Sequence, residues 1–136
     1  MQNKFVKLYL PALAYMAAIF TLSSFHRVPL PYIDRLSVDK IYHIIEYGIL
    51  GFLLMRLLTL EKFKIKTGGK ILIVFAIGTV YGITDEIHQY FVPGRYFSYW
   101  DIAVDSIGSS LGAVLYYRWG IKLEQFFRSI KLGSTE

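Results

Sequence analysis

The chain has 136 residues, of which 54% are hydrophobic, 17% aromatic and only 18% charged, and its formal net charge is +5. Ordinary soluble domains carry roughly a quarter charged residues, so this composition indicates one small membrane domain over residues 1–136. The sequence contains no cysteine, which excludes disulfides and thiolate metal sites. Because the basic residues lie between long apolar runs, they favour anionic lipid headgroups as partners, and we expect no nucleic-acid binding.

Four apolar segments follow one another along the chain, each close to the ~20 residues that a membrane helix needs. They predict membrane spans at about 6–24, 40–60, 70–92 and 101–119. The first segment has a basic start, as a signal peptide has. Its apolar stretch is longer than the ~7–15 residues of such a peptide and lacks a clear Ala-x-Ala cleavage site, so we expect it to be a membrane anchor.

The distribution of lysine and arginine predicts the orientation of these spans. Most of the 15 basic residues lie at the N-terminus, in the second connection and at the C-terminus. The first and third connections hold only Arg27, Arg35, Lys40 and Arg95. Because cytoplasmic loops are enriched in lysine and arginine, both termini are expected in the cytoplasm. The predicted fold is therefore an all-α integral membrane four-helix bundle with N-in/C-in topology.

Polar residues recur on one face of each of the last three spans, because positions three and four apart share a helix face. The stripes are Asp39, His43 and Glu46, continued by Leu50; Gly82, Asp85, Glu86 and Gln89; and Asp101, Asp105, Gly108 and Gly112. An ionisable side chain inside a membrane costs about 2.5 kcal/mol or more, so such residues mark a functional site by default. The predicted topology puts the stripes at one outer level, where we expect them to converge on an outward-facing pocket. The Gly108-x-x-x-Gly112 spacing predicts close approach of the fourth helix to a neighbour.

Some of these polar residues also have structural explanations. Ser37 and Ser98 are predicted N-caps, which would place Asp39 and Asp101 in first helical turns, where the helix dipole favours a carboxylate. Capping does not explain the deeper acids, for which the structural alternative is an interhelical network that only fixes the bundle. These deeper acids are Glu46, Asp85 and Glu86.

The connection between the last two spans predicts a tight turn. In Pro93-Gly94, proline presets φ and glycine accepts the positive φ of a type II turn. The guanidinium of Arg95 then either contacts headgroups or lies over the acid layer, where it can hold a ligand phosphate bidentately. His88 lies to the side of the acid stripe, so we expect an interfacial position for it. The aromatic residues here predict an interfacial belt: Tyr90, Phe91, Tyr96, Phe97, Tyr99 and Trp100.

These motifs, in this order, resemble those of the VanZ-like family of small membrane proteins. They are Asp39-Lys40-x-x-His43-x-x-x-Tyr47-x-x-Leu50-Gly51, Tyr81-Gly82-x-x-Asp85-Glu86-x-x-Gln89, Pro93-Gly94-Arg95, and Asp101 with Gly108 and Gly112. The resemblance covers about residues 20–116 and includes Ser23-Ser24. It implies a multi-pass bundle in the bacterial cytoplasmic (inner) membrane, and the family's namesake is linked to lowered susceptibility to the glycopeptide teicoplanin. Asp105 departs from the family pattern, which usually has asparagine there.

The first functional hypothesis is an enzyme that acts at the outer leaflet on a lipid-linked cell-wall precursor or a phospholipid headgroup. A protonated acid beside an ionised one is the arrangement that general acid–base catalysis uses. The candidate catalytic residues are Glu86, Asp85, His43 and Glu46. The candidate substrate-binding residues are Arg95 and Lys40, which would hold phosphate, with Gln89, Asp39, Asp101 and Asp105.

The second hypothesis is a non-catalytic binder or modulator that holds a headgroup, a glycopeptide or a wall precursor in the same pocket. The third is a carboxylate and histidine site for a divalent metal in a metal-dependent hydrolase, because these ligands suit hard or borderline cations. The spacing His43-x-x-Glu46 would place two ligands on one helix, although no recognised metal motif is complete and no cofactor is otherwise expected. A transporter is disfavoured, because the spans show no inverted repeat.

Overall fold

The computed structural model describes residues 3–25 and 32–133, and all regular structure within these ranges is helical. This confirms the predicted all-α class. The elements in chain order are α1 (Lys4–Leu8), α2 (Leu10–Ser23), α3 (Tyr32–Leu60), α4 (Thr67–Tyr90), α5 (Tyr99–Leu115), the π-helical segment η1 (Tyr116–Gly120) and α6 (Ile121–Gly133).

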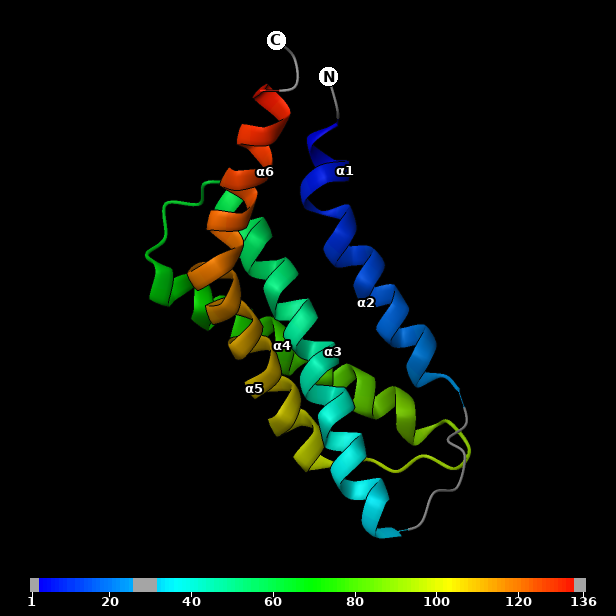
Figure 1. Ribbon diagram of the computed structural model, residues 1–136. Coiled ribbons are helices and arrows are strands. Elements are labelled where there is room, and N and C mark those ends of the chain that lie inside the picture. Colours follow the sequence, from blue (N-terminus) through cyan, green and yellow to red (C-terminus); the bar gives the residue numbers. More distant parts are fainter. Residues whose placement is uncertain (1–2, 26–31, 134–136) are drawn as a thin grey trace.

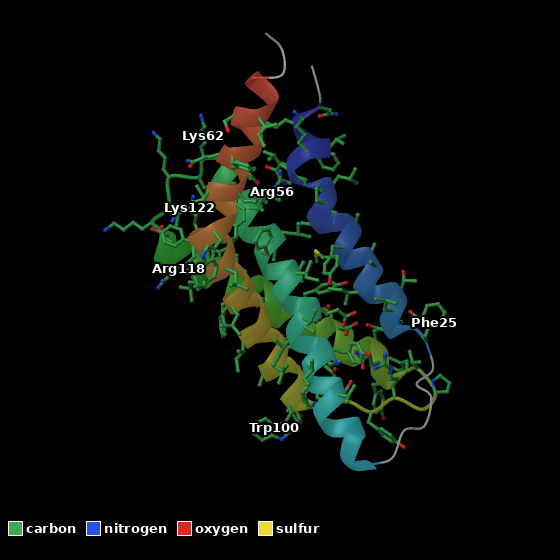
Figure 2. All side chains as sticks on the ribbon, viewed as in Figure 1. Phe25, Arg56, Lys62, Trp100, Arg118 and Lys122 are labelled. Atoms are coloured by element: carbon green, nitrogen blue, oxygen red, sulfur yellow. The ribbon has the colours of Figure 1, made fainter. Side chains whose placement is uncertain are left out.

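The long helices alternate in direction, so the molecule has two chemically different ends (Figure 1). In Figure 1, α1 and α6 lie together at the top, and α3 and α5 run side by side below them. We call this upper end the basic end. The opposite end, where α2 and α4 end and α3 and α5 begin, is called the polar end. The labelled residues of Figure 2 show the contrast, with Arg56, Lys62, Arg118 and Lys122 towards the basic end and Trp100 at the polar end.

Two helical segments among the described residues are long and apolar enough to cross a membrane, Val38–Leu60 and Thr67–Tyr90. They correspond to the predicted second and third spans. Helix α2 is apolar but has only 14 residues, and α5 has 17 residues and buries two aspartates. The prediction of four spans is therefore confirmed in part, and the four-helix membrane bundle with N-in/C-in orientation stays a prediction.

The helix boundaries differ from the predicted ones where charge interrupts the apolar pattern. Helix α3 begins at Tyr32, so Ser37 lies inside the helix and the prediction that it is an N-cap is wrong. The physical reason is that the segment before Lys40 is polar but contains neither glycine nor proline after Pro31, so nothing in it breaks a helix. The predicted N-cap Ser98 is confirmed, because its hydroxyl oxygen accepts a hydrogen bond from the backbone N–H of Asp101.

Glycines bring α5 into backbone contact with α3. A Cβ atom added to Gly108 would lie 2.8 Å from the carbonyl oxygen of Ile44, and one added to Gly112 would collide with the carbonyl oxygen of Gly48. In the same way, a Cβ atom on Gly51 would collide with the backbone of Ser109. The close approach predicted from the Gly-x-x-x-Gly spacing is confirmed, and its partner is α3.

A second Gly-x-x-x-Gly pair joins α5 to α4, and the sequence analysis missed it. Gly78 and Gly82 are both buried on α4 and face the side chains of Ser109 and Asp105. A Cβ atom on Gly82 would lie 2.8 Å from Oδ2 of Asp105, so this carboxylate packs directly against the α4 backbone. Helix α5 is thus held between α3 and α4, and its two aspartates, Asp101 and Asp105, are buried.

The apolar core lies between these helices, and other large apolar side chains face outwards. The core includes Tyr47, Leu50, Met55, Val74 and Tyr116, each at most 1% exposed. Leu50 therefore continues the buried stripe of α3, as predicted. The outward-facing apolar side chains include Leu72, Val80, Ile107, Leu111 and Trp119. Such an apolar exterior is typical of a protein surface that contacts lipid.

Candidate functional site

The polar stripe of α3 meets the polar stripe of α5 at the polar end. Nδ1 of His43 lies 2.8 Å from Oδ1 of Asp105, and Nε2 of the same ring lies 3.8 Å from Oδ1 of Asp39. Lys40, which is next to Asp39 in the chain, forms an ion pair with Asp101. His43 is 3% exposed and Asp105 is fully buried. The imidazole of His43 is therefore held between carboxylates from two helices.

The α4 stripe contributes a chain of hydrogen bonds that links α2 to the turn after α4. Oδ1 of Asp85 lies 2.5 Å from the hydroxyl of Ser23 on α2, and Oδ2 accepts a hydrogen bond of 2.7 Å from the amide of Gln89. The Gln89 carbonyl oxygen accepts in turn from Nη1 of Arg95 at 3.1 Å. Asp85 and Gln89 are both buried, so this chain runs through the interior of the polar end.

Glu86 is attached to the beginning of α5. Its Oε2 atom accepts a hydrogen bond of 2.7 Å from the backbone N–H of Ser98, the N-cap residue. A carboxylate is favoured at a helix N-terminus, where unpaired N–H groups and the helix dipole both attract negative charge. Glu86 is fully buried, although it is near the C-terminal end of its own helix, where the dipole disfavours it.

Three buried oxygen atoms in this region have neither a hydrogen-bond partner nor an ion-pair partner among the described residues. They are Oε1 of Glu86, Oδ2 of Asp105 and the hydroxyl of Tyr47. Buried polar groups are normally hydrogen-bonded, and leaving one unpaired costs about 1–3 kcal/mol. These atoms are therefore the ones in the polar end that a donor group of a ligand would satisfy.

Comparison with known families identifies the chain. The VanZ/LLP1 family model matches residues 2–122, which is most of the sequence. The chain belongs to the VanZ/LLP1 family. No curated protein and no solved structure matches it. Together with its two apolar helices, this assigns the chain as a VanZ-like membrane protein.

The remaining predicted residues of this VanZ-like chain occupy the margin of the cluster. Glu46 is half-buried and interacts electrostatically with the phenol groups of Tyr15, Tyr47 and Tyr81, which places it on the flank of α3 towards α2 and α4. His88 accepts or donates a hydrogen bond to Ser24 at 2.9 Å. Its ring lies 4.2 Å from the ring of Phe20, so His88 packs against α2, away from His43.

The predicted tight turn is also present. Gly94 has φ of 80°, and the backbone N–H of Arg95 donates to the carbonyl oxygen of Val92 at 3.1 Å, which is the pattern of a type II turn. The turn places Arg95, which is half-buried, beside Gln89. The aromatic residues of this region are exposed, as predicted for an interfacial belt, apart from Phe97; the exposed ones are Tyr90, Phe91, Tyr96, Tyr99 and Trp100.

Three contributors to the cluster were missed as site residues in the sequence analysis. Ser23 has no motif that points to Asp85, because their contact depends on how α2 docks against α4. Ser98 was predicted only as a cap, yet it also binds Glu86 and lies 3.5 Å from Nζ of Lys40. Tyr47 belongs to the family motif and is buried beside the ring of His43. The sequence signal was its position four residues after His43, which puts both side chains on one helix face.

One group of side chains has the composition and spacing of a metal site. Asp39, His43 and Asp101 each offer one ligand atom, and these atoms lie within 4.8 Å of one another. The sequence predicted His43 and Glu46 as a pair of metal ligands, but only His43 belongs to this group. Asp101 comes from α5, and spacing along a single helix cannot reveal a ligand from another helix.

Proposed function

We propose that the polar end faces the exterior of the bacterial cytoplasmic membrane and binds the polar headgroup of a lipid-linked cell-wall precursor. The observation that carries this proposal is the pair of fully buried carboxylates, Glu86 and Asp105, each with one oxygen that no described group satisfies. Buried charges at membrane depth are expensive and usually serve a pathway or a ligand.

The chemistry of the cluster favours a ligand rich in hydrogen-bond donors. The unsatisfied atoms of Glu86 and Asp105 are acceptors, which sugar hydroxyl or amino groups would satisfy. Lys40 is already paired with Asp101, so it is a weaker phosphate ligand than the sequence suggested. Arg95 lies at the turn beside the exposed aromatic belt, where its guanidinium is positioned for a phosphate at the membrane interface.

An acid–base hydrolase of the same headgroup is the second candidate, and the environment of His43 favours it. Asp105 orients the imidazole through Nδ1, which leaves Nε2 for proton transfer. Ser23, at 2.5 Å from Asp85, is a hydroxyl in contact with a carboxylate, but Asp85 is also engaged by Gln89. Binding without chemistry requires fewer additional groups, so we rank the binder first and expect it to alter teicoplanin susceptibility.

The test compares cells that lack the endogenous gene with cells that carry wild-type protein or the variants Glu86→Gln, Asp85→Asn and Arg95→Ala. Lipid extracts and teicoplanin susceptibility are measured together. The matched control is Glu124→Gln, which removes a carboxylate at the basic end. We expect susceptibility to change with wild-type protein and the control, and to revert in the three polar-end variants.

The lipid extracts then separate the two candidates. An unchanged lipid profile supports the binder, whereas a new lipid species that disappears in Glu86→Gln supports the hydrolase. If all three variants fold and retain the wild-type phenotype, the buried carboxylates serve only the structure and the proposal is wrong.

A further inference from the structure

We propose that Asp39, His43 and Asp101 form a binding site for one divalent cation of the Mn²⁺ or Zn²⁺ type, and that the ammonium group of Lys40 competes with the metal for it. The proposal goes beyond headgroup binding, because it names an occupant of the polar end that binds without any lipid.

The donor set suits such a cation. Two carboxylates and one imidazole are ligands for Mn²⁺ and Zn²⁺, with water in the remaining positions. Ligands about 2.1 Å from a shared ion lie up to roughly 4 Å apart, so the observed spacing within 4.8 Å requires movements of roughly 1 Å. His43 and Asp101 are buried, and the Asp39 side chain is 13% exposed.

The orientation of His43 is an independent argument for a cation. Its Nδ1 lies 2.8 Å from the carboxylate of Asp105, which accepts the ring N–H and thereby leaves the lone pair on Nε2. That Nε2 atom faces Oδ1 of Asp39 at 3.8 Å. A ring lone pair that faces a carboxylate oxygen favours a positive species at this position, either a second proton on the ring or a bound cation. A carboxylate that orients a histidine from behind is also the usual second-shell partner of a metal-bound imidazole.

Glu86 provides a further observation that points to a ligand. It is fully buried, and its Oε1 atom has no hydrogen-bond partner among the described residues. Its other oxygen binds the backbone of Ser98, whose hydroxyl is 3.5 Å from Nζ of Lys40. Glu86 also interacts electrostatically with His43 and Lys40, so its carboxylate lies near the same group of side chains. There it can accept a hydrogen bond from a metal-bound water.

When no metal is bound, the ammonium group of Lys40 supplies positive charge to this group of carboxylates. Its ammonium pairs with Asp101, and its side chain is 26% exposed, so the flexible stem can move outwards. Among the side chains that the structure describes, this cluster holds more carboxylates than permanent cations, which are Lys40 and Arg95. Its carboxylates are Asp39, Asp85, Glu86, Asp101 and Asp105. A divalent ion that displaces the ammonium would therefore meet a negative site.

The test titrates Mn²⁺ into the full-length protein in detergent and follows the free ion by electron paramagnetic resonance, with Zn²⁺ as competitor. We expect one Mn²⁺ per chain in the wild type. His43→Gln and Asp39→Asn should each weaken binding roughly tenfold or more, because each removes a ligand. Lys40→Met should tighten binding about fivefold, because it removes the competing charge. Glu61→Gln, at the basic end, is the control and should not change it.

The same titration can refute the metal site. Thermal melting of each variant shows whether it is folded. The proposal is overturned if neither the wild type nor folded Lys40→Met binds Mn²⁺, or if Mn²⁺ binds equally well to folded Asp39→Asn. Because no lipid is present, this result is independent of the headgroup proposal. A chain that binds metal yet leaves teicoplanin susceptibility unchanged would refute only the proposed function.

Discussion

The two ends of the molecule handle charge in opposite ways. At the basic end, Lys4 pairs with Glu61 at 2.8 Å and Arg56 with Glu124 at 2.7 Å, and the Lys4 side chain is 68% exposed. In Figure 2, Lys62 and Lys122 project to the outside of this end, whereas Arg56 lies between the helices. At the polar end, four acids are buried, namely Asp85, Glu86, Asp101 and Asp105, and Asp105 packs against Gly82 of α4.

This difference separates exposed ion pairs, which are ordinary on a protein surface, from buried charges, which are costly and need a functional or structural reason. Ion pairs near a protein surface contribute about 0–1 kcal/mol and keep the chain compatible with water and lipid headgroups. A buried charge that loses its partner costs roughly 3–5 kcal/mol, so burying several of them is a poor way to stabilise a fold. For this reason, the polar end is the part of the molecule where we propose that a ligand binds.

The largest expected effect comes from breaking the scaffold that holds the polar end. Gly112→Ala places a methyl group on the carbonyl oxygen of Gly48, a backbone atom that cannot rotate away. We expect α3 and α5 to separate and the folded protein to be lost, with at least ~3 kcal/mol of destabilisation. Gly68→Ala is the matched control, because a Cβ atom there meets nothing within 4 Å. Size-exclusion chromatography and thermal melting in detergent measure both variants.

The next effect concerns the buried pair of His43 and Asp105. Asp105→Ala leaves the ring N–H without its acceptor and should lower the free energy of unfolding by about 3 kcal/mol. Asp105→Asn keeps an amide oxygen that accepts from Nδ1, so it should lose less than about 1.5 kcal/mol. Equal losses in the two variants would show that the bond to His43 does not matter. Denaturant unfolding in detergent decides between these outcomes.

A smaller effect is expected from the corresponding pair at the basic end. Arg56→Gln and Glu124→Gln should each change the free energy of unfolding by less than about 1 kcal/mol, because both side chains are partly exposed. A double-mutant cycle on this pair should give a weaker coupling than the cycle on His43 and Asp105. A coupling of similar size at both ends would remove the contrast on which the account rests.

The smallest effect is a pH dependence at Glu61. Hydrogen bonds from Lys4 and Tyr9 hold the pKa of Glu61 below its ordinary value of 4.5. Its contribution to stability is therefore complete above pH 4.5 and is lost as the pH falls through the lower folded pKa. Nuclear magnetic resonance titration of the Glu61 carboxyl should show this lowered midpoint, and Lys4→Met should raise it. An unchanged midpoint in Lys4→Met would mean that the ammonium is not its cause.

The helical stripes were predictable from sequence because the period of a helix is local. Asp101 and Asp105, like Gly82 and Glu86, needed only their spacing to be assigned to buried faces. The close packing of α5 followed from Gly108 and Gly112 in the same way.

Contacts between distant helices were not predictable, because they depend on docking and not on spacing. Nothing near Ser23 in the sequence indicates that it meets Asp85, and nothing near Lys40 selects Asp101 as its partner. The start of α3 at Tyr32 was missed because the hydropathy pattern locates the apolar part of a helix and not its polar first turns.

The central claim is that the polar end is reached from outside the cell, and labelling of single cysteines tests it most directly. The native chain has no cysteine, so each variant reports one position. Tyr96→Cys lies at the polar end, where Tyr96 is 79% exposed, and Lys64→Cys lies in the exposed connection between α3 and α4. In intact cells, a membrane-impermeant maleimide should label Tyr96→Cys, and Lys64→Cys only after permeabilisation. The reverse pattern would put the polar end in the cytoplasm and contradict the account.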